Sequence, residues 1–444
     1  MKNAIKFLTA NDDKFIYIKL VLLAILLFGG FMFWPMMVIA FVLIALFIIF
    51  ERAAFSLCYV FFFMPFMYVF TFPNPFGLSF WNLIIIVFVL VIGVRYIYDL
   101  IKKNKKFNFK LILPFLAFFV FTALPINHGF SILTVLETLV WLALFYEIII
   151  YFDEIKLENL VLIFIVGLLY SSVIGFYIDR IPYLSEMVVK YYIGSTLRFS
   201  GLTVSPNIYY AFVLTAMALL YVLVYNNNLN RNYLALFLPL TLLGVLSISK
   251  TFMIGLAVLG FLIFISLLSK QKNNKKQSIE NCAIILVTLV LAIIILLPTA
   301  KLAFSRSIVD ESSETGTVLF NGRTLIWETY LTDFVSSWKN VVFGKGLGSA
   351  TGLLNTNSHS AYIQFIYELG VAGGLIYLVG AIWIYVLTKR KILNDILCFS
   401  WIALAILMFY SLMENHFFSQ VGNMLLMVSV AIIFYNKEKE DANT

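Results

Sequence analysis

The chain has 444 residues, of which 62% are hydrophobic and only 12% are charged, and its mean hydropathy is +0.98. Because a soluble domain carries about 25% charged residues, this composition excludes an ordinary soluble protein and indicates a polytopic membrane protein. The formal net charge of +8 follows from where Lys and Arg lie relative to the predicted spans, so it predicts no nucleic-acid partner.

Apolar runs follow one another along nearly the whole chain. Lipid offers no partner to backbone N–H and C=O groups, so a run of roughly 17–25 apolar residues crosses the bilayer as a helix. We therefore expect an all-α protein with about 14 transmembrane helices, forming a single polytopic membrane domain over residues 1–444. The expected spans are 15–33, 36–50, 54–71, 80–98, 111–125, 131–151, 160–178, 207–225, 233–248, 252–268, 281–298, 359–387, 396–411 and 420–435.

Positive charges in the connections predict the orientation of these spans, because cytoplasmic connections carry an excess of Lys and Arg. With the N-terminus in the cytoplasm, roughly twice as many of these residues fall inside as outside. Both termini are then cytoplasmic, and two long segments, 179–206 and 299–358, lie outside. Since the other connections are short, we expect the protein to work at its outer face.

Charged residues within the spans are few. Glu137 and Glu147, in the sixth expected span, are the main exceptions. Each is either a proton-relay or ion-site residue, or a glutamate near a helix end that reaches the interface. The three cysteines lie in or beside apolar runs, without the spacing of metal ligands or of a disulfide framework. We expect neither a metal ion nor another cofactor.

The first long outer segment ends in a candidate anion-binding sequence. Arg198 precedes a turn at Gly201, and Pro206-Asn207 marks the start of a helix. An arginine side chain presents a planar set of donors that matches phosphate oxygens and stays charged at any working pH. Arg198 therefore either binds a phosphate group or pairs with lipid headgroups of the outer leaflet.

A second cation lies in the tight outer connection 247–251, which reads S-I-S-K-T. The Lys250 side chain cannot reach far from so short a connection. It either extends along apolar surface toward the interface or points into a cavity shared with other outer residues.

The second long outer segment contains a predicted aromatic helix. Four aromatic residues recur at helical spacing within 321–340. This pattern predicts an amphipathic helix on the outer membrane surface, with Trp at the depth of the lipid headgroups. Arg323 lies in the first turn of this helix, so the helix determines its position. The aromatic residues are Trp327, Tyr330, Phe334 and Trp338.

A glycine-rich turn and a histidine follow. Residues 343–349 read F-G-K-G-L-G-S, and glycines allow close backbone approach, but the G-x-x-x-x-G-K-[ST] pattern of a phosphate-binding loop is absent. His359 is either a base that takes a proton from a hydroxyl near neutral pH or an interfacial side chain hydrogen-bonded to the loop. His128, His416 and Glu414 are also expected at the outer edges of spans.

In this order, these segments resemble the O-antigen polymerase and O-antigen ligase superfamily of bacterial cell-surface glycan assembly. The matching segments are Arg198-x-x-Gly201 with Pro206-Asn207, Ser249-Lys250, Gly322-Arg323-x-x-x-Trp327, Gly344-x-Gly346-x-Gly348, and His359-Ser360 followed after nine residues by Gly370 and then by Gly373. The family usually has Ser-Arg where this chain has Ser249-Lys250, and lysine lacks the two-pronged geometry of arginine.

The resemblance implies a fold and a site. The fold is the C-type glycosyltransferase architecture, with one large extracytoplasmic loop and an active site facing outward from the bacterial cytoplasmic (inner) membrane. The substrate is a polyprenyl-diphosphate-linked glycan, and Arg198, Lys250 and Arg323 hold its diphosphate in place of a metal ion. His359 deprotonates or orients the acceptor hydroxyl. Candidates for a secondary role in the site are Arg180, Arg306, Asn207 and Glu414.

The implied enzyme is a metal-independent glycosyltransferase, and two reactions fit it. A polymerase joins lipid-linked repeat units into O-antigen, capsule or exopolysaccharide, whereas a ligase transfers the glycan to lipid A–core. The expected number of spans favours the polymerase. A transporter or flippase of the same pathway is a third interpretation, but it needs a polar path to both faces. The polymerase would work with membrane lipid, a flippase and a chain-length regulator, and with no nucleic acid.

Overall fold

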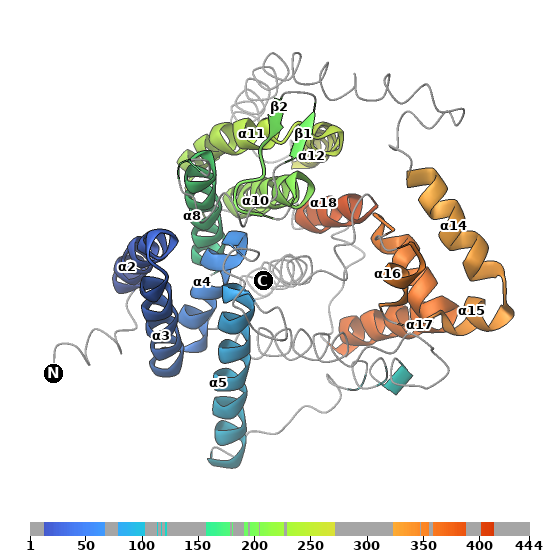
Figure 1. Ribbon diagram of the computed structural model, residues 1–444, viewed down its shortest axis with the longest axis horizontal. Helices are drawn as coiled ribbons and strands as arrows, with labels where there is room; N and C mark the ends of the chain where they lie inside the picture. The colour runs from blue at the N-terminus through green and yellow to red at the C-terminus, as the bar shows by residue number, and fades with distance from the viewer. Residues whose placement is uncertain are drawn as a thin grey trace. The chain divides into compact units, whose positions relative to one another are not determined.

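The computed structural model describes residues 13–66, 79–102, 157–177, 191–193, 196–203, 205–225, 229–270, 323–346, 348–354, 358–387 and 401–412, and the single positions 113, 117, 120, 121 and 180. The chain divides into two compact units. The first comprises Met1–Tyr98, Ile149–Leu302 and Ala431–Thr444, and the second comprises Asp99–Ile148 and Ala303–Val430. Among the described residues both units are mainly helical (Figure 1), in agreement with the expected all-α class.

The first unit is a set of apolar helices in which α10 is central. Its elements are α2 (Asp13–Met32), α3 (Trp34–Phe50), α4 (Ala53–Phe63), the 3-10 turn η1 (Met64–Phe66), α5 (Phe80–Lys102), α8 (Leu157–Phe176), β1 (Tyr191–Ile193), β2 (Thr196–Arg198), α10 (Pro206–Tyr225), η4 (Arg231–Leu236), α11 (Phe237–Leu246) and α12 (Lys250–Lys270). Helix α10 packs against α8, α11 and α12. Because α10 is apolar on every face, nearly all of its side chains are buried.

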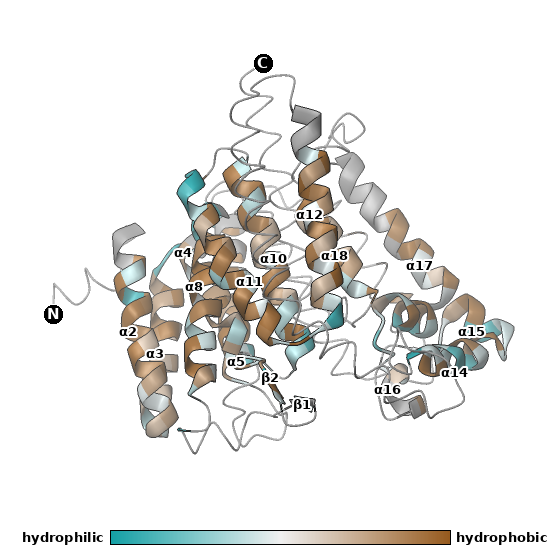
Figure 2. Cartoon of the chain, turned by 90° about the horizontal axis from the view of Figure 1, so that it is seen from above, coloured by the Kyte–Doolittle hydropathy of each residue, from teal (hydrophilic) through white to brown (hydrophobic). Residues whose placement is uncertain are grey.

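Two described helices are long and apolar enough to cross a membrane, Glu158–Phe176 and Pro206–Tyr225. They coincide closely with the expected spans 160–178 and 207–225. The other described apolar helices are shorter, although hydrophobic residues run along most of their length (Figure 2). The larger number of spans expected from the sequence stays a prediction.

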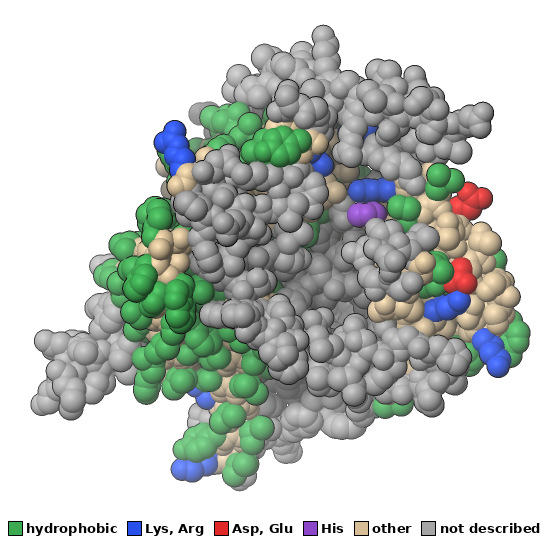
Figure 3. Space-filling model, in the orientation of Figure 1, with side chains coloured by type: hydrophobic (Ala, Val, Ile, Leu, Met, Phe, Trp, Pro, Cys, Tyr) green, Lys and Arg blue, Asp and Glu red, His purple; other side chains and the backbone are tan. Residues whose placement is uncertain are grey.

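Hydrophobic side chains gather on the outer side of α2 and α3 (Figure 3). On α2, Ile18, Val21 and Ile25 are each more than half exposed, whereas Leu23 and Leu27 on the opposite side are fully buried. A large exposed apolar face next to a packed one marks an interaction surface. In a chain of this composition, we expect lipid to cover that face.

One described segment departs from the all-helical expectation. Strands β1 and β2 form a two-stranded antiparallel hairpin in which Tyr191 pairs with Arg198. The sequence carried a signal for it, because aromatic and β-branched residues flank Gly194-Ser195, a typical two-residue hairpin connection. The hairpin lies within the long segment 179–206 and brings Arg198 to the end of a strand.

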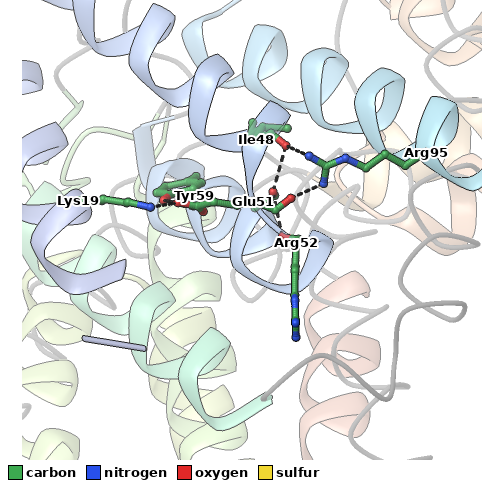
Figure 4. A network of polar contacts seen from close by, with 7 residues as sticks. Lys19, Ile48, Glu51, Arg52, Tyr59 and Arg95 are labelled. Atoms are coloured by element: carbon green, nitrogen blue, oxygen red, sulfur yellow. Dashed lines mark hydrogen bonds and ion pairs between the residues drawn. The ribbon is translucent and has the colours of Figure 1, made fainter. Parts of the chain in front are cut away.

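A buried polar cluster joins α2, α3, α4 and α5 (Figure 4). Glu51 follows the last residue of α3 and forms an ion pair with Lys19 of α2, and both side chains are almost fully buried. The Tyr59 hydroxyl of α4 lies 2.9 and 3.0 Å from the two Glu51 carboxylate oxygens. From α5, Arg95 donates to the carbonyls of Ile48, at 3.0 Å, and of Glu51.

Arg95, a residue of α5, therefore caps the C-terminal end of α3. The last carbonyls of a helix have no partner within it, and in α3 a guanidinium from α5 supplies one. A positive charge at this position is also favoured by the dipole of α3. The cluster thus connects these four helices.

The second unit contains α14 (Arg323–Val335), α15 (Trp338–Phe343), α16 (Ser349–Leu354), α17 (Ala361–Leu387) and α18 (Trp401–Ser411). Helices α14, α15 and α16 all pack against α17. Their shared core consists of Tyr330, Phe334, Ala350 and Tyr367. We call the described residues from Arg323 to Leu369 the α14–α17 module.

Candidate functional site

The predicted site residues lie in both units, and each group is described within its own. Arg198, Asn207 and Lys250 belong to the first unit, and Arg323 and His359 belong to the second. Arg180, a predicted secondary residue, lies in the first unit with its guanidinium over the Tyr177 ring, 5.6 Å from the ring centroid. Other candidates lie outside the described residues, namely Arg306, Glu414, His128, His416, Glu137 and Glu147.

Arg198 and Asn207, two residues of the predicted site, are hydrogen-bonded to each other. The Arg198 Nε–H donates to the Ser247 carbonyl at 3.0 Å, and its Nη2 donates to the Asn207 side-chain oxygen at 3.3 Å. Asn207 is in the first turn of α10, and Ser247 follows the last residue of α11. Arg198 thus connects the start of α10 to the end of α11.

Lys250 lies at the same end of this helix group. It is the first residue of α12, three residues after the Ser247 carbonyl that accepts from Arg198. The positive ends of the α10 and α12 dipoles therefore lie at the same end as the Arg198 and Lys250 side chains. Helix N-termini and guanidinium groups both favour anions, so this end of the first unit is suited to a phosphate-bearing ligand.

The turn that carries Arg198 depends on Gly201. Its φ is +55°, a left-handed conformation that favours glycine. A Cβ atom there would lie 2.8 Å from the Tyr209 ring, so a side chain would collide with α10. Gly201 therefore lets the chain turn back tightly from β2 to α10 and keeps Arg198 beside Asn207.

Backbone strain marks two of the predicted segments. Among the described residues, the non-glycine residues with positive φ are Ile248, at +47°, and His359, at +51°. This conformation is uncommon outside glycine, and for a β-branched residue such as isoleucine it is a clear outlier. Ile248 lies within Ser-Ile-Ser-Lys, two residues before Lys250, and His359 begins the His-Ser segment. Such strain persists where the surroundings enforce it, and it is concentrated at functional sites.

Hydrogen bonds on both sides hold the strained His359 turn. The Ser358 hydroxyl donates to the Ser360 carbonyl at 2.7 Å and accepts from the Ser360 amide at 3.2 Å. The Trp327 indole N–H donates to the Ser358 carbonyl at 2.8 Å. Ser358 and Ser360 are buried, whereas His359 between them is partly exposed. A rigid turn therefore presents one partly accessible imidazole.

Helix α14 differs from the predicted surface helix in length and in the direction of its aromatic face. The helix expected within 321–340 ends at Val335, and α15 begins at Trp338 after an N-cap at Ser337. Tyr330 and Phe334 are buried in the core of the module, while Trp338 is 68% exposed. The aromatic spacing predicted the helix correctly, but Tyr330 and Phe334 pack inward, because residues of α16 and α17 cover that face.

A carboxylate on α14 ties the module together. Asp333 accepts from the Lys345 ammonium at 2.8 Å and from the Tyr367 hydroxyl at 2.6 Å. Burial raises the pKa of Asp333, but the hydrogen bonds from Lys345 and Tyr367 and the charge of Lys345 lower it by more, so its pKa lies below the usual value. Burial raises the pKa of Tyr367, and the hydrogen bond to Asp333 and the negative charge of Asp333 raise it further. Asp333 thus stays ionised and holds α14 to the loop and to α17.

The glycine-rich turn has a structural role in the module. The amides of Lys345 and Gly346 donate to the carbonyls of Tyr367 and Glu368, each at 2.9 Å. Helix α17 is interrupted just after these carbonyls, because Gly370 has a φ of +63°. The interruption leaves these helix carbonyls without amide donors from α17 itself, and the turn supplies the donors instead. In the described part of the turn, the amides of Lys345 and Gly346 thus serve α17.

The interruption at Gly370 also corrects the expected span 359–387. Residues 361–369 form a separate short helix that packs on α14, α15 and α16, and only the part after Gly370 continues the apolar helix. Nine residues at 1.5 Å each are too short to cross a bilayer. We therefore place the start of this span after Gly370, and the residues before it belong to the α14–α17 module.

Glu368 and Gln364 are polar residues of the module that sequence reasoning missed. Glu368 is fully buried, and its Oε1 accepts from the Ala350 amide at 3.3 Å and from the Gln364 side chain at 2.9 Å. Burial raises the pKa of Glu368 to about 7, against the lowering effect of hydrogen bonds from Gly348, Ala350 and Gln364. The available signal was a lone glutamate inside the apolar run F-I-Y-E-L-G.

The contact between Gly344 and Gly370 gives a testable prediction for stability. A Cβ on Gly344 would lie 2.3 Å from the Glu368 carbonyl oxygen and 2.6 Å from the Gly370 amide, and its φ is +72°. We expect Gly344→Ala to destabilise the protein by about 1–3 kcal/mol through backbone strain, with about as much again through overpacking. Thermal unfolding of the detergent-solubilised protein measures this loss.

Gly374→Ala is the matched control for Gly344→Ala. Its Cβ would meet the Phe365 ring at 3.7 Å, an ordinary van der Waals contact, and Gly374 is not among the glycines with positive φ. We expect this variant to unfold at nearly the wild-type temperature. Equal unfolding temperatures for the two alanine variants would show that the Gly344 contact is not required.

Comparison with known proteins adds no relative to this picture: no protein-family model matches the chain, and no curated protein matches it either.

Proposed function

We propose that the protein is a glycosyltransferase that polymerises polyprenyl-diphosphate-linked oligosaccharide repeat units at the outer face of the bacterial cytoplasmic membrane. The observation that carries the proposal is the backbone strain at Ile248 and His359. His359 begins the His359-Ser360 segment, and Ile248 directly precedes Ser249-Lys250; the sequence singled out both segments for their resemblance to O-antigen polymerases and ligases. Strain of this kind supports a functional role for the segments that contain it.

The proposed reaction follows from the chemistry of the side chains. The acceptor hydroxyl attacks the anomeric carbon of the donor glycan, and the bond from that carbon to the diphosphate oxygen breaks. The hydroxyl proton passes to the His359 imidazole, and the polyprenyl diphosphate leaves with the bonding electrons. Positive groups aimed at the departing diphosphate stabilise the transition state more than the ground state, and Arg198, Lys250 and Arg323 are the proposed groups.

The first unit supports the part of the proposal that concerns the diphosphate. Arg198 is held by Ser247 and Asn207, so its guanidinium is oriented before a ligand binds. Lys250 and the N-termini of α10 and α12 lie at the same end of the unit. A preorganised group of this kind costs little reorganisation during the reaction. The absence of a metal ion from the reaction remains part of the proposal.

Reconstitution tests the proposed function directly. Purified protein in liposomes is supplied with polyprenyl-diphosphate-linked repeat units and no other component. Products with two or more joined repeats support the polymerase. Transfer that needs added lipid A–core identifies the ligase instead. Movement of the lipid-linked unit across the membrane without a new glycosidic bond identifies a transporter, and either of these two results contradicts the polymerase.

Arg323→Lys tests whether a two-pronged cation is needed. We expect polymer formation to fall by an amount equivalent to about 2–4 kcal/mol in the transition state, because lysine keeps the charge but loses the planar pair of donors. Arg198→Lys is a less clean test, since it also removes the bonds to Ser247 and Asn207. Initial rates of chain growth at matched protein levels provide the measurement.

Lys250→Arg is the control for this prediction, because it restores the residue that the resembling family usually has at this position. We expect Lys250→Arg to keep most of the activity. Full activity in Arg323→Lys would exclude two-pronged binding of the diphosphate by Arg323.

A further inference from the structure

The starting observation is a hydrogen bond that joins α14 to the His359 turn. The Trp327 indole N–H donates to the carbonyl of Ser358, the residue directly before His359, at 2.8 Å. The two residues are 31 positions apart in the sequence. Because the carbonyl belongs to the strained turn itself, this bond fixes the plane of the peptide that leads into His359.

Trp327 also lies next to the proposed cation on the same helix. Arg323 begins α14, and Trp327 follows it by four residues, which is about one helical turn. Residues at this spacing lie on the same face of a helix. One side chain therefore links the part of α14 that carries Arg323 to the turn that carries His359.

Further along α14, two other side chains attach the helix to the rest of the module. The Tyr330 hydroxyl donates to the Ala350 carbonyl at 2.5 Å, and Asp333 accepts from Lys345 and Tyr367. These contacts hold α14 against α16 and α17. They do not involve the Ser358–Ser360 turn, so they do not replace the contact made by Trp327.

We propose that Trp327 is a positioning residue that sets the His359 imidazole relative to Arg323 through the Ser358 carbonyl. The proposal rests on the function proposed above, because it gives Trp327 a role in aligning acceptor activation with diphosphate binding. A misplacement of about 1 Å in such an arrangement can cost 10²-fold in rate. Trp327 itself touches neither substrate nor reacting atoms in this scheme.

Trp327→Phe tests the proposal, because it keeps an aromatic ring and removes the N–H donor. We expect kcat for chain growth to fall by about 10–10²-fold, with KM for the lipid-linked donor changed by less than about 3-fold. The effect should disappear when His359 is already replaced. In the His359→Gln background, adding Trp327→Phe should change the residual rate by less than about 2-fold.

The matched controls are Trp338→Phe and Tyr330→Phe. Trp338 is 68% exposed, so its replacement should leave kcat unchanged. Tyr330→Phe removes a buried tie of the same helix and should lower the unfolding temperature more than it lowers kcat. A loss of kcat from Trp327→Phe that is just as large in the His359→Gln background would overturn the positioning role.

A chemical readout separates this inference from the proposed function. Diethylpyrocarbonate acylates histidines, and the chain has only three, so His128 and His416 serve as internal references in peptide mass spectrometry. We expect His359 to react at least about 3-fold faster in Trp327→Phe than in wild type, because the turn loses a bond that holds it. Trp338→Phe should leave the rate unchanged.

The chemical result stands whether or not polymer forms. An unchanged His359 reaction rate in Trp327→Phe overturns the positioning role even if the protein is an active polymerase. A changed rate in a protein that makes no polymer supports the contact and contradicts the proposed function.

Discussion

His359→Ala should reduce polymer formation by roughly 10²–10⁴-fold, the usual contribution of a general base. The loss should occur with normal protein levels in the membrane, because His359 is partly exposed and its side chain is not part of the module core. Initial rates of chain growth in liposomes measure it. His128→Ala and His416→Ala are the controls, since the sequence places both at the outer edges of spans, and we expect both to stay largely active.

The backbone at His359 allows the chemical role to be separated from the structural one. Asparagine tolerates the left-handed conformation, so His359→Asn removes the base without adding strain. His359→Gln can keep a hydrogen bond to the acceptor but cannot take the proton. If His359 is the base, both variants should be nearly inactive. Substantial activity in His359→Gln would instead identify a residue that orients the acceptor.

In His359→Gly, we expect activity to fall while stability stays the same or rises. Glycine adopts a φ of +51° without strain, so this variant should unfold at the wild-type temperature or above it while losing activity. Strain kept at a site for function predicts this trade-off. A His359→Ala protein that polymerises at the wild-type rate would show that the catalytic assignment is wrong.

Removing one partner of the buried Lys19–Glu51 pair should destabilise the protein by about 3–5 kcal/mol, because it leaves an uncompensated buried charge. Lys19 is 0% and Glu51 is 2% exposed, so water cannot solvate the charge that remains. Glu51→Leu also removes the acceptor of the Tyr59 hydroxyl. Thermal unfolding of the detergent-solubilised single variants measures the loss.

The double variant shows whether the loss of stability comes from an unpaired buried charge or from the substitution of a buried side chain as such. In Lys19→Met with Glu51→Leu no charge is left unpaired, and we expect much of the lost stability to return. Lys102→Met, in an exposed position on the last turn of α5, changes the same residue type and should have little effect. If the single variants unfold at the wild-type temperature, the pair does not stabilise the four helices.

Hydropathy predicted the helices that form from a single apolar segment. The helices Glu158–Phe176 and Pro206–Tyr225 were located because an apolar run of that length has one way to satisfy its backbone. No pattern in the sequence indicated which distant segments would be in contact. Lys19 and Glu51 are 32 residues apart, and neither sequence neighbourhood indicates the other. The buried cluster therefore could not be predicted, although each of its helices could.

The candidate site was predicted in the same uneven way. The sequence singled out the segments with Arg198, Lys250, Arg323 and His359, because they lie in the predicted outer connections and resemble one family's motifs in order. It did not predict that Arg198 would be held by Ser247, since the pairing depends on how β2 meets the end of α11. It predicted the α14 helix but not which neighbours would cover its aromatic face. It predicted from the glycines of residues 343–349 a close backbone approach, but not that the backbone approached there would be that of the interrupted α17.

The Gly344–Gly370 contact has a consequence for how this part of the chain can vary. A Cβ on either glycine would meet main-chain atoms of the other segment at 2.3–2.8 Å. A clash with a side chain can be relieved by shortening that side chain, but every residue has the same main chain. No second substitution can therefore rescue a change at either position. In a library randomised across α15–α17 and passed through selection for folded protein, both positions would return as glycine, independently of everything around them.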